Sequence, residues 1–362
     1  MSSALVSVVI PTYNRAYCIE RAIDSVLAQT HRHVDVIVVD DGSKDDTREL
    51  IARRYGGDAR VRYIYQENRG VTGARNAGLR QVRGDYVALL DSDDIWKFWK
   101  LELQVACLER LTQAGMIWTD MEAIDPDGRV FDPAFLRTMY SAYQWFTSDD
   151  LFDESFPLPD ISVSPPALTN PPRLYLGDIY SPMVMGNLVH TSTVLLRRER
   201  FEKVREFNEE LRYSGEDYDF HLRTCREGPV AFVNLASIEY QKGMPDQLTS
   251  DAYNIFRARN FLNTITPVLK RDRERIRLSH DMLRFLLSDA HQWVGEAALD
   301  IGETAEARRH LSRSLLLRPW QPRSAGLLIL AILPRRFGEG MRQLYRTVKA
   351  MARRLTHEAP IP

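Results

Sequence analysis

The chain has 362 residues, enough for two or three domains or for one large domain with an appendage. Its content of 44% hydrophobic and 27% charged residues is typical of a water-soluble globular protein. The formal net charge of −1 provides no general attraction for nucleic acid, so we expect no nucleic-acid partner.

The first hundred residues alternate between short apolar runs and segments with helical periodicity. The expected strands are Val6–Ile10, Val34–Asp40, Val61–Gln66 and Asp85–Asp91, and the expected helices are Ile19–Leu27, Asp45–Tyr55, Gly73–Val82 and Lys97–Leu111. Ser43 is in position to cap the second of these helices. Strands and helices that alternate at this pace predict an α/β fold with a mostly parallel sheet flanked by helices.

The pattern changes after residue 115. Met116–Val130 predicts a hairpin with Asp127 and Gly128 in its turn. Residues 131–185 have clustered prolines and little periodicity, which predicts a long irregular insertion of the functional kind. A regular pattern resumes at Thr191–Arg198, followed by a helix from Glu216 and a strand over Val230–Tyr240.

The chain has a helical pattern from residue 249 onward. Trp293–Pro319 predicts a helical hairpin that turns at Gly302 and resembles a single tetratricopeptide unit, within a bundle over residues 249–334. Residues 335–362 form a basic tail in which 335–355 has amphipathic helical spacing. Two interpretations of the tail stay open: contact with an anionic membrane, or packing on the bundle with a solvated basic face.

The three cysteines Cys18, Cys107 and Cys225 lie far apart and form no CxxC pair. Their spacing argues against a disulfide framework or a zinc ribbon and fits a reducing, cytoplasmic setting. The N-terminal residues lack the basic and apolar segments of a signal peptide, so we expect none. The longest uncharged apolar run, Ser324–Pro334, is too short to span a bilayer.

Two apolar runs end in carboxylates: VVDDGSKDDT, which starts at Val38, and VALLDSDDIW, which starts at Val87. In an open parallel sheet, ligands bind at the carboxyl ends of the strands. The carboxylates there repel one another unless a cation is bound, and Mg²⁺ or Mn²⁺ prefers such oxygen ligands together with substrate phosphates. The residues alone therefore predict a metal–phosphate site made from Asp40, Asp41, Asp91, Asp93 and Asp94.

Each carboxylate group also has a simpler explanation. Asp40 and Asp41 are suited to a turn, and Asp93, Asp94 and Asp217 are each suited to the start of a helix. The chain has no GxxxxGK[ST] motif and no GxGxxG after its first strand, so neither a P-loop NTPase nor a dinucleotide-dependent dehydrogenase is supported.

Five segments carry a resemblance to a known family: VSVVIPTYNRAYCIERAIDSVLAQT, VIVVDDGSKDDT, ENRGVTGARNAGL, GDYVALLDSDDIW and GEDYDFHLR. In this order and at this spacing they resemble the family 2 glycosyltransferases, which are inverting nucleotide-sugar enzymes with the Rossmann-like GT-A fold. The resemblance covers roughly residues 5–245 and implies a GT-A domain over residues 1–248, with the insertion on the acceptor side.

The resemblance also implies donor-site roles. The loop formed by Pro11, Thr12, Tyr13 and Asn14 would line the nucleotide base, with Tyr13 stacked on it. Asp41 would accept a hydrogen bond from the base, and Arg75 would lie near the base or the diphosphate. Asp91 would lie near the ribose, with Ser92 in the same donor site.

The remaining implied roles concern the metal and the acceptor. Asp93, with Asp94 close by, would hold Mn²⁺ or Mg²⁺ on the diphosphate, where the metal neutralises the leaving group. Asp217 resembles the catalytic base that inverting transfer requires, and Glu216 would orient it or touch the acceptor. His190 and Trp96 would lie on the acceptor side, although each also fits a structural role.

Some features depart from the family pattern. The segment Val204–Leu211, VREFNEEL, lacks the glycines that usually precede Phe-Asp-Glu, and no QxxRW string is present. The absence of QxxRW leads us to expect a non-processive enzyme. The resemblance implies a nucleotide-diphosphate sugar as the donor, with UDP-sugars as the first expectation. The acceptor would be a glycan or lipid-linked molecule in surface polysaccharide synthesis, and the enzyme would lie in the cytoplasm or at the inner face of the membrane.

Two other functions remain open. A nucleotidyltransferase on a similar sheet usually has a Gly-rich basic loop after its first strand, and PTYNRAYCIE lacks one. A non-catalytic member that acts as a partner of another transferase would have lost its metal ligand or its base, whereas Asp93 and Asp217 are both present.

Overall fold

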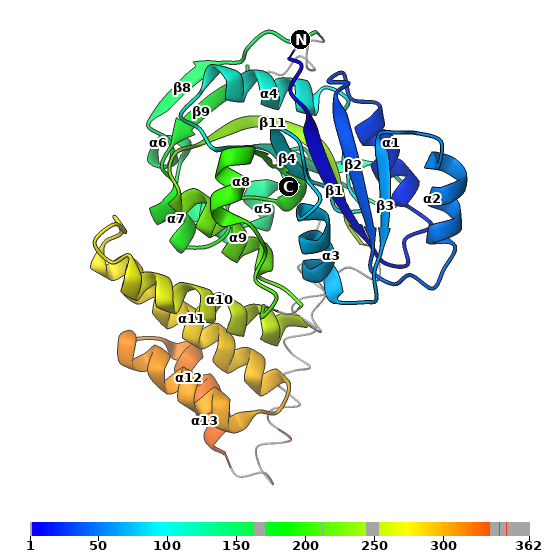
Figure 1. Ribbon diagram of the computed structural model, residues 1–362. Coiled ribbons are helices and arrows are strands. Elements are labelled where there is room, and N and C mark those ends of the chain that lie inside the picture. Colours follow the sequence, from blue (N-terminus) through cyan, green and yellow to red (C-terminus); the bar gives the residue numbers. More distant parts are fainter. Residues whose placement is uncertain are drawn as a thin grey trace. The chain divides into compact units, whose positions relative to one another are not determined.

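The computed structural model describes residues 2–162, 171–211, 213–243 and 253–333, together with Gly340 and Tyr345. The chain folds into two compact units, Met1–Leu248 and Thr249–Pro362. The first contains an α/β sheet with helices on its faces, and the described part of the second is helical (Figure 1).

The first half of the sheet is parallel, in the order β3-β2-β1-β4. Its strands are β1 (Val6–Thr12), β2 (Val34–Asp40), β3 (Val61–Tyr65) and β4 (Tyr86–Leu89), and the helices between them are α1 (Ile19–Leu27), α2 (Thr47–Tyr55) and α3 (Gly70–Leu79). Every residue of β1 and β2 is buried, which explains their continuous β-branched sequence. The register pairs Thr12 with Asp40, so the carboxyl ends of these two strands lie side by side.

The second half of the sheet is mixed, so the prediction of a mostly parallel sheet holds only for the first half. The strand β10 (Leu195–Arg197) runs antiparallel between β4 and β6 (Met116–Ile124), and β6 pairs in parallel with β11 (Val230–Gln241). The other strands are β5 (Ile95–Trp96), β7 (Val130–Asp132), β8 (Glu154–Pro157) and β9 (Arg173–Gly177). The helices are α4 (Lys100–Arg110), α5 (Leu136–Met139), η1 (Ser141–Trp145), α6 (Ser148–Leu151), α7 (Tyr180–Val184), η2 (Thr191–Thr193), α8 (Arg198–Val204) and α9 (Glu216–Arg226).

The prediction that residues 131–185 are irregular was wrong for much of the segment that the structure describes. Strand β9 pairs with β11 and with β8, and so extends the main sheet. Its alternating pattern places Leu174 and Leu176 in the core. A short strand with one apolar face gives too weak a pattern to be found among clustered prolines.

Three smaller predictions also need correction. Ser43 does not cap α2, because its Oγ accepts a hydrogen bond from the Asn14 N–H instead. Helix α4 begins at Lys100 rather than Lys97, whose N–H donates to the Ser237 carbonyl while β5 pairs with β11. The segment from Thr191 begins with a 3-10 turn, and only Leu195–Arg197 is a strand.

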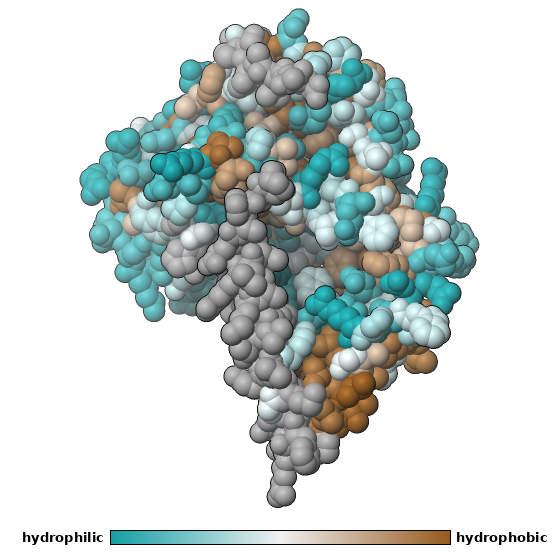
Figure 2. All heavy atoms as spheres, turned by 180° about the vertical axis from the view of Figure 1, so that it is seen from behind, coloured by the Kyte–Doolittle hydropathy of each residue, from teal (hydrophilic) through white to brown (hydrophobic). Residues whose placement is uncertain are grey.

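The described part of the second unit consists of α10 (Asn254–Arg271), α11 (His280–Asp300), α12 (Thr304–Leu317) and α13 (Pro322–Ile332). Helices α11 and α12 form the predicted hairpin, and Gly302 has a φ of +85° at its turn. Figure 2 shows hydrophobic side chains gathered on one face of this unit. No described helix is long and apolar enough to cross a membrane. The predicted amphipathic segment 335–355 lies outside the described residues, apart from Gly340 and Tyr345.

Candidate active site

The loop after β1 is joined to the loop after β2. The side chain of Asn14, whose φ is +52°, accepts a hydrogen bond from the Lys44 N–H at 2.8 Å. Pro11 and Thr12 are buried at the end of β1, whereas Tyr13 is exposed. The structure therefore places Tyr13 at the surface beside the carboxyl ends of β1 and β2, where a planar base can reach its ring.

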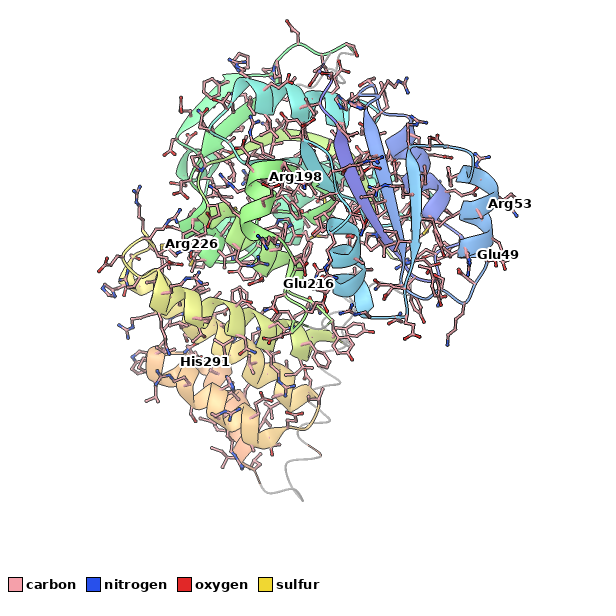
Figure 3. The ribbon with its side chains drawn as sticks, in the orientation of Figure 1. Glu49, Arg53, Arg198, Glu216, Arg226 and His291 are labelled. Carbon is pink, nitrogen blue, oxygen red and sulfur yellow. The ribbon has the colours of Figure 1, made fainter. Side chains whose placement is uncertain are left out.

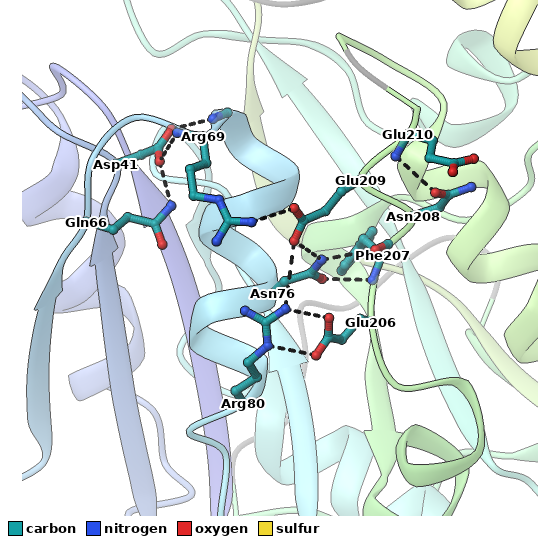
Figure 4. Close-up of polar contacts among 11 residues, drawn as sticks. Asp41, Gln66, Arg69, Asn76, Arg80, Glu206, Phe207, Asn208, Glu209 and Glu210 are labelled. Carbon is teal, nitrogen blue, oxygen red and sulfur yellow. Dashed lines mark hydrogen bonds and ion pairs between the residues drawn. The ribbon is translucent and has the colours of Figure 1, made fainter.

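The carboxylates at the end of β2 accept hydrogen bonds from several protein donors. Asp41 accepts hydrogen bonds from the Gln66 side chain at 2.7 Å and from the N–H groups of Arg69 and Gly70 at 2.8 Å each (Figure 4). Asp40 accepts one from the Tyr63 hydroxyl at 2.6 Å. Burial raises the pKa of Asp41, and the three donors partly oppose that rise. These bonds fix Asp41 in place at the carboxyl end of β2.

Arg75 connects three of the sequence motifs. This buried residue of α3 donates to Asp91 at 2.7 Å and to Glu216 at 2.8 Å. Burial lowers the pKa of the Arg75 guanidinium, but the charges of Asp91 and Glu216 outweigh burial and raise it above its ordinary value. Arg75 is therefore a permanent cation that holds the ends of β4 and α9 together.

A second group of side chains can hold a cation. Asp91, Asp94 and His190 each offer one ligand atom, and these atoms lie within 4.8 Å of one another. Asp94 is 1% exposed, and neither of its carboxylate oxygens has a hydrogen-bond partner among the described residues. Burial, followed by the charges of Asp93 and Asp91, raises the pKa of Asp94 well above its ordinary value. An orphaned carboxylate beside a second carboxylate and a histidine suits a divalent metal ion.

Two predicted ligands occupy different places from those expected. Asp93, expected to be the main metal ligand, lies outside this group, with its carboxylate 3.6 Å from the guanidinium of Arg15. His190, expected on the acceptor side, lies inside it. Burial lowers the pKa of His190 to about 4, so its imidazole is neutral at ordinary pH and can act as a ligand. Ser92, which lies between Asp91 and Asp93 in the sequence, is buried, and its carbonyl accepts a hydrogen bond from the Cys18 thiol.

The acidic pair of the GED motif opens α9. Gly215 has a φ of +91°, a left-handed conformation that glycine adopts without strain, and it precedes Glu216 and Asp217 in the first helical turn (Figure 3). Asp217 accepts a long hydrogen bond from the Asn187 side chain at 3.4 Å. Burial raises the pKa of both carboxyls. Burial together with the charge of Asp217 raises the pKa of Glu216 to about 7. Asp217 therefore combines few protein donors with a raised proton affinity, as a general base requires.

The segment of residues 205–211, which we call the strap, fastens α3 to α9. Asn76 of α3 exchanges two hydrogen bonds with the backbone of Phe207, at 2.8 and 3.0 Å (Figure 4). The Phe207 ring stacks on Phe220 of α9 with centroids 4.2 Å apart. The guanidinium of Arg75 lies 5.3 Å from the centroid of the Phe207 ring. In place of the missing glycines, Arg205 adopts a φ of +61°.

Trp96, which was expected on the acceptor side or in a structural role, lies in the core. Its ring is buried, its N–H donates to the Ser192 carbonyl at 2.8 Å, and the Lys100 ammonium lies 4.1 Å from its ring centroid. The bulk of the side chain is thus used in packing. Trp99 and Trp118 are also buried.

Sequence reasoning missed several residues of the site. Asn187 and Arg15 contact predicted residues, and the charge of Asp217, after burial, helps to raise the pKa of Tyr140. The ENRG segment signals the donors to Asp41, but Tyr140 and Asn187 lie in or next to the proline-rich stretch, where no pattern marks them.

Comparison with known proteins agrees with this geometry. Residues 7–140 match the model of the family described as glycosyl transferase family 2. An uncharacterised glycosyltransferase of Rickettsia prowazekii is 32% identical over 233 residues, which make up 64% of this chain and 61% of that protein. The match thus spans less than two thirds of that relative's length. TuaG of Bacillus subtilis, named as a teichuronic acid biosynthesis glycosyltransferase, is 38% identical over 147 residues, or 37% of this chain and 58% of that protein.

Two solved structures share the fold. Residues 1–349 of TarS from S. aureus, in complex with UDP-GlcNAc, give a TM-score of 0.52 at 19% identity and cover 94% of this chain and 92% of that one. The mannosyltransferase PcManGT from Pyrobaculum calidifontis, in complex with GDP-Man and Mn²⁺, gives a TM-score of 0.52 at 18% identity and covers 91% and 86%. Residues 7–140 therefore match glycosyltransferase family 2, and the unit that contains them shares the GT-A fold of these two structures.

Proposed function

We propose that the chain transfers a sugar from a nucleotide-diphosphate sugar to a hydroxyl group of an acceptor, with inversion at the anomeric carbon. One observation carries the proposal. Carboxylates from separate motifs converge on one place, where Arg75 bridges Asp91 and Glu216 while Asp94 lacks any described partner. The side chains that can bind a cation are thus different from the carboxylate that can act as a base, and inverting transfer needs both.

The donor binds at the carboxyl ends of β1, β2 and β4. Pro11, Thr12 and Asn14 shape the loop, Tyr13 stacks on the base, and Asp41 receives the base N–H. Its three protein donors hold the Asp41 carboxylate in a fixed position for that bond. Support for a nucleotide sugar comes from the structures of TarS in complex with UDP-GlcNAc and of PcManGT in complex with GDP-Man, and we propose a UDP-sugar.

The metal ion is Mn²⁺ or Mg²⁺, held by Asp94 with Asp91 and His190, and Asp93 is near enough in sequence to contribute. The unpartnered oxygens of Asp94 are the observation that fits a cation, and PcManGT was solved in complex with Mn²⁺. When bound, the ion supplies positive charge that neutralises the departing diphosphate. Arg75 adds a permanent positive charge on the same side.

Asp217 takes the proton from the acceptor hydroxyl as that oxygen attacks the anomeric carbon. Burial raises its pKa, which strengthens it as a base, and Asn187 orients one of its oxygens. Glu216 is held by Arg75 and therefore positions the first turn of α9 rather than exchanging protons. Because the acceptor oxygen attacks from the face opposite the departing nucleoside diphosphate, the product is inverted.

The acceptor is a glycan or a lipid-linked molecule in surface polysaccharide synthesis, as the name of TuaG suggests. We place the enzyme in the cytoplasm or at the inner face of the membrane, with residues 335–355 as one contact to anionic lipid. Deleting residues 335–362 should weaken binding to anionic vesicles, and unchanged binding would exclude that contact.

Thermal shift measurements with UDP, GDP, TDP, CMP and common nucleotide sugars, with and without Mn²⁺, test the donor site. A ligand at a hundred times its Kd adds about 2.7 kcal/mol of stability. We expect one nucleotide to give a Mn²⁺-dependent shift that Asp94→Asn abolishes and that the exposed control Asp149→Asn retains. Comparison with Asp93→Ala shows whether Asp93 also holds the metal.

A non-catalytic partner of another transferase is the alternative. The measurement that separates the two functions is slow hydrolysis of the bound donor, which is monitored as the release of free sugar. Donor binding without hydrolysis, and without transfer to any acceptor in the cognate lysate, would favour the non-catalytic function. The retained Asp217 and its raised pKa favour catalysis.

A further inference from the structure

Exposed apolar side chains gather on α12 and α13 of the helical unit. Trp320 is 95% exposed, Leu316 74%, Ile329 60% and Ile332 59% (Figure 2). A surface helix normally has one polar face, and α13 has almost none, since apolar residues lie on all its sides. Side chains of this size exposed together mark a contact surface.

The same surface is basic. The described residues 307–333 contain five arginines and no aspartate or glutamate, and of these arginines Arg323 pairs with Glu296 of α11. On α12, the buried residues Ala307, Leu311 and Ser314 define the inner side of the helix. Arg309 and Arg313 therefore fall on the outer side, where Leu316 is also exposed. Apolar and cationic side chains thus share one face.

We propose that this face of α12 and α13 docks on a lipid bilayer that contains anionic headgroups. Tryptophan and branched apolar side chains enter the boundary between headgroups and acyl chains, while arginines on the same face attract the lipid phosphates. The contact is separate from segment 335–355, and it does not depend on the proposed function, because a non-catalytic chain would dock in the same way.

Charge argues against the other occupants. A second copy docked through the same face would bring the arginines of both copies together without acidic partners. Segment 335–355 is itself basic, with Arg335, Arg336 and Arg342, so it does not supply the acidic groups that this face lacks, and its Tyr345 donates a hydrogen bond to Glu296 of α11 at 2.8 Å. An anionic and partly apolar surface satisfies both features of the face.

Vesicle flotation of the full-length chain tests the proposal. Vesicles of phosphatidylcholine alone are compared with vesicles of phosphatidylcholine mixed with phosphatidylglycerol. We expect binding to the anionic vesicles only, weakened by roughly tenfold in Trp320→Ser. Removing charge in Arg309→Gln and Arg313→Gln should weaken it by about fivefold for each arginine.

Matched variants in the N-terminal unit are the controls. Trp145→Ser removes an exposed tryptophan, and Arg53→Gln removes an exposed arginine on α2, so neither should change vesicle binding. Unchanged thermal unfolding of Trp320→Ser shows that the helical unit is intact. No binding of the wild type, or equal binding of wild type and Trp320→Ser, overturns the proposal. A wild-type dimer that Trp320→Ser dissociates, in a chain that binds no vesicles, identifies a second copy as the occupant instead.

Discussion

The carboxylates after β2 and those after β4 look alike in sequence but have opposite surroundings. Asp41 accepts three hydrogen bonds from its own chain, whereas Asp94 is just as buried and accepts none of ordinary geometry from the described residues, although Ser192 and the backbone of Gln241 lie close enough to oppose the rise of its pKa in part. Burying a charged group without partners costs several kcal/mol, so such a group persists where a ligand repays that cost. The first carboxylate is paired within the chain before any ligand binds, and the second is the one that we propose a cation completes.

Asp217 has an environment closer to that of Asp94, because its one hydrogen bond to a side chain is long. Replacing it in Asp217→Asn should lower kcat by about a thousandfold while leaving nucleotide affinity nearly unchanged. The measurement is sugar transfer or donor hydrolysis beside nucleotide titration. Asp219→Asn, on the same helix but paired with Arg223, is the control and should keep most activity. Equal loss in both variants would show that the helix, rather than the base, had been damaged.

Arg75 connects the carboxylates after β4 with those at the start of α9. Arg75→Met leaves Asp91 and Glu216 buried without their cation, and we expect a loss of about 3 to 5 kcal/mol in the free energy of unfolding. Chemical denaturation measures this loss. Arg80→Met, which breaks the half-exposed pair with Glu206, should cost no more than about 1 kcal/mol. A comparable cost for both would mean that the buried bridge is not what holds α3 to α9.

Replacing the orphaned carboxylate should stabilise the metal-free protein. Asp94→Asn removes a buried acid without partners, and we expect a gain of about 1 to 3 kcal/mol together with loss of metal binding. The pKa of Asp94 is raised, so the folded protein binds more protons than the unfolded chain once pH exceeds the ordinary value of 3.8. Wild-type stability therefore falls as pH rises, and the advantage of the variant grows.

Thermal unfolding at mildly acidic and mildly alkaline pH measures that advantage. Mn²⁺ together with the donor nucleotide should stabilise the wild type and not the variant, which reverses their order. An Asp94→Asn chain that is less stable than the wild type at every pH would show that Asp94 has a structural partner.

The contrast between the two carboxylate groups could not be read from the sequence. Apolar runs that end in aspartates were enough to predict strands β1, β2 and β4 and a site at their ends, because buried parallel strands have a strong pattern. Which carboxylate is orphaned depends on contacts across more than a hundred residues, such as those of Asp91 with Ser192 and of Arg75 with Glu216. The spacing of residues within one motif does not indicate such contacts.

The same limit explains the errors on the acceptor side. The sequence left Trp96 either on the acceptor side or in the core, and the pairing of β5 with β11 turns its ring into the core. Strand β9 depends on β11 for its hydrogen bonds and β8 depends on β9, so their own short sequences do not specify them. Family resemblance placed the motifs correctly because it reflects whole folds rather than local patterns.

Asp41, the carboxylate that accepts three hydrogen bonds, gives the test with the smallest expected effect. Asp41→Asn keeps the size of the side chain but turns one oxygen into a donor that faces the N–H of Gly70 or Arg69. We therefore expect a loss of about 1 kcal/mol in the free energy of unfolding, opposite in sign to the effect of Asp94→Asn. Gln66→Ala removes one donor to the same carboxylate and is the matched control, with a loss of similar size. If Asp41→Asn were stabilising, the donors around Asp41 would not compensate its burial, and both carboxylates would then be sites that only a ligand completes.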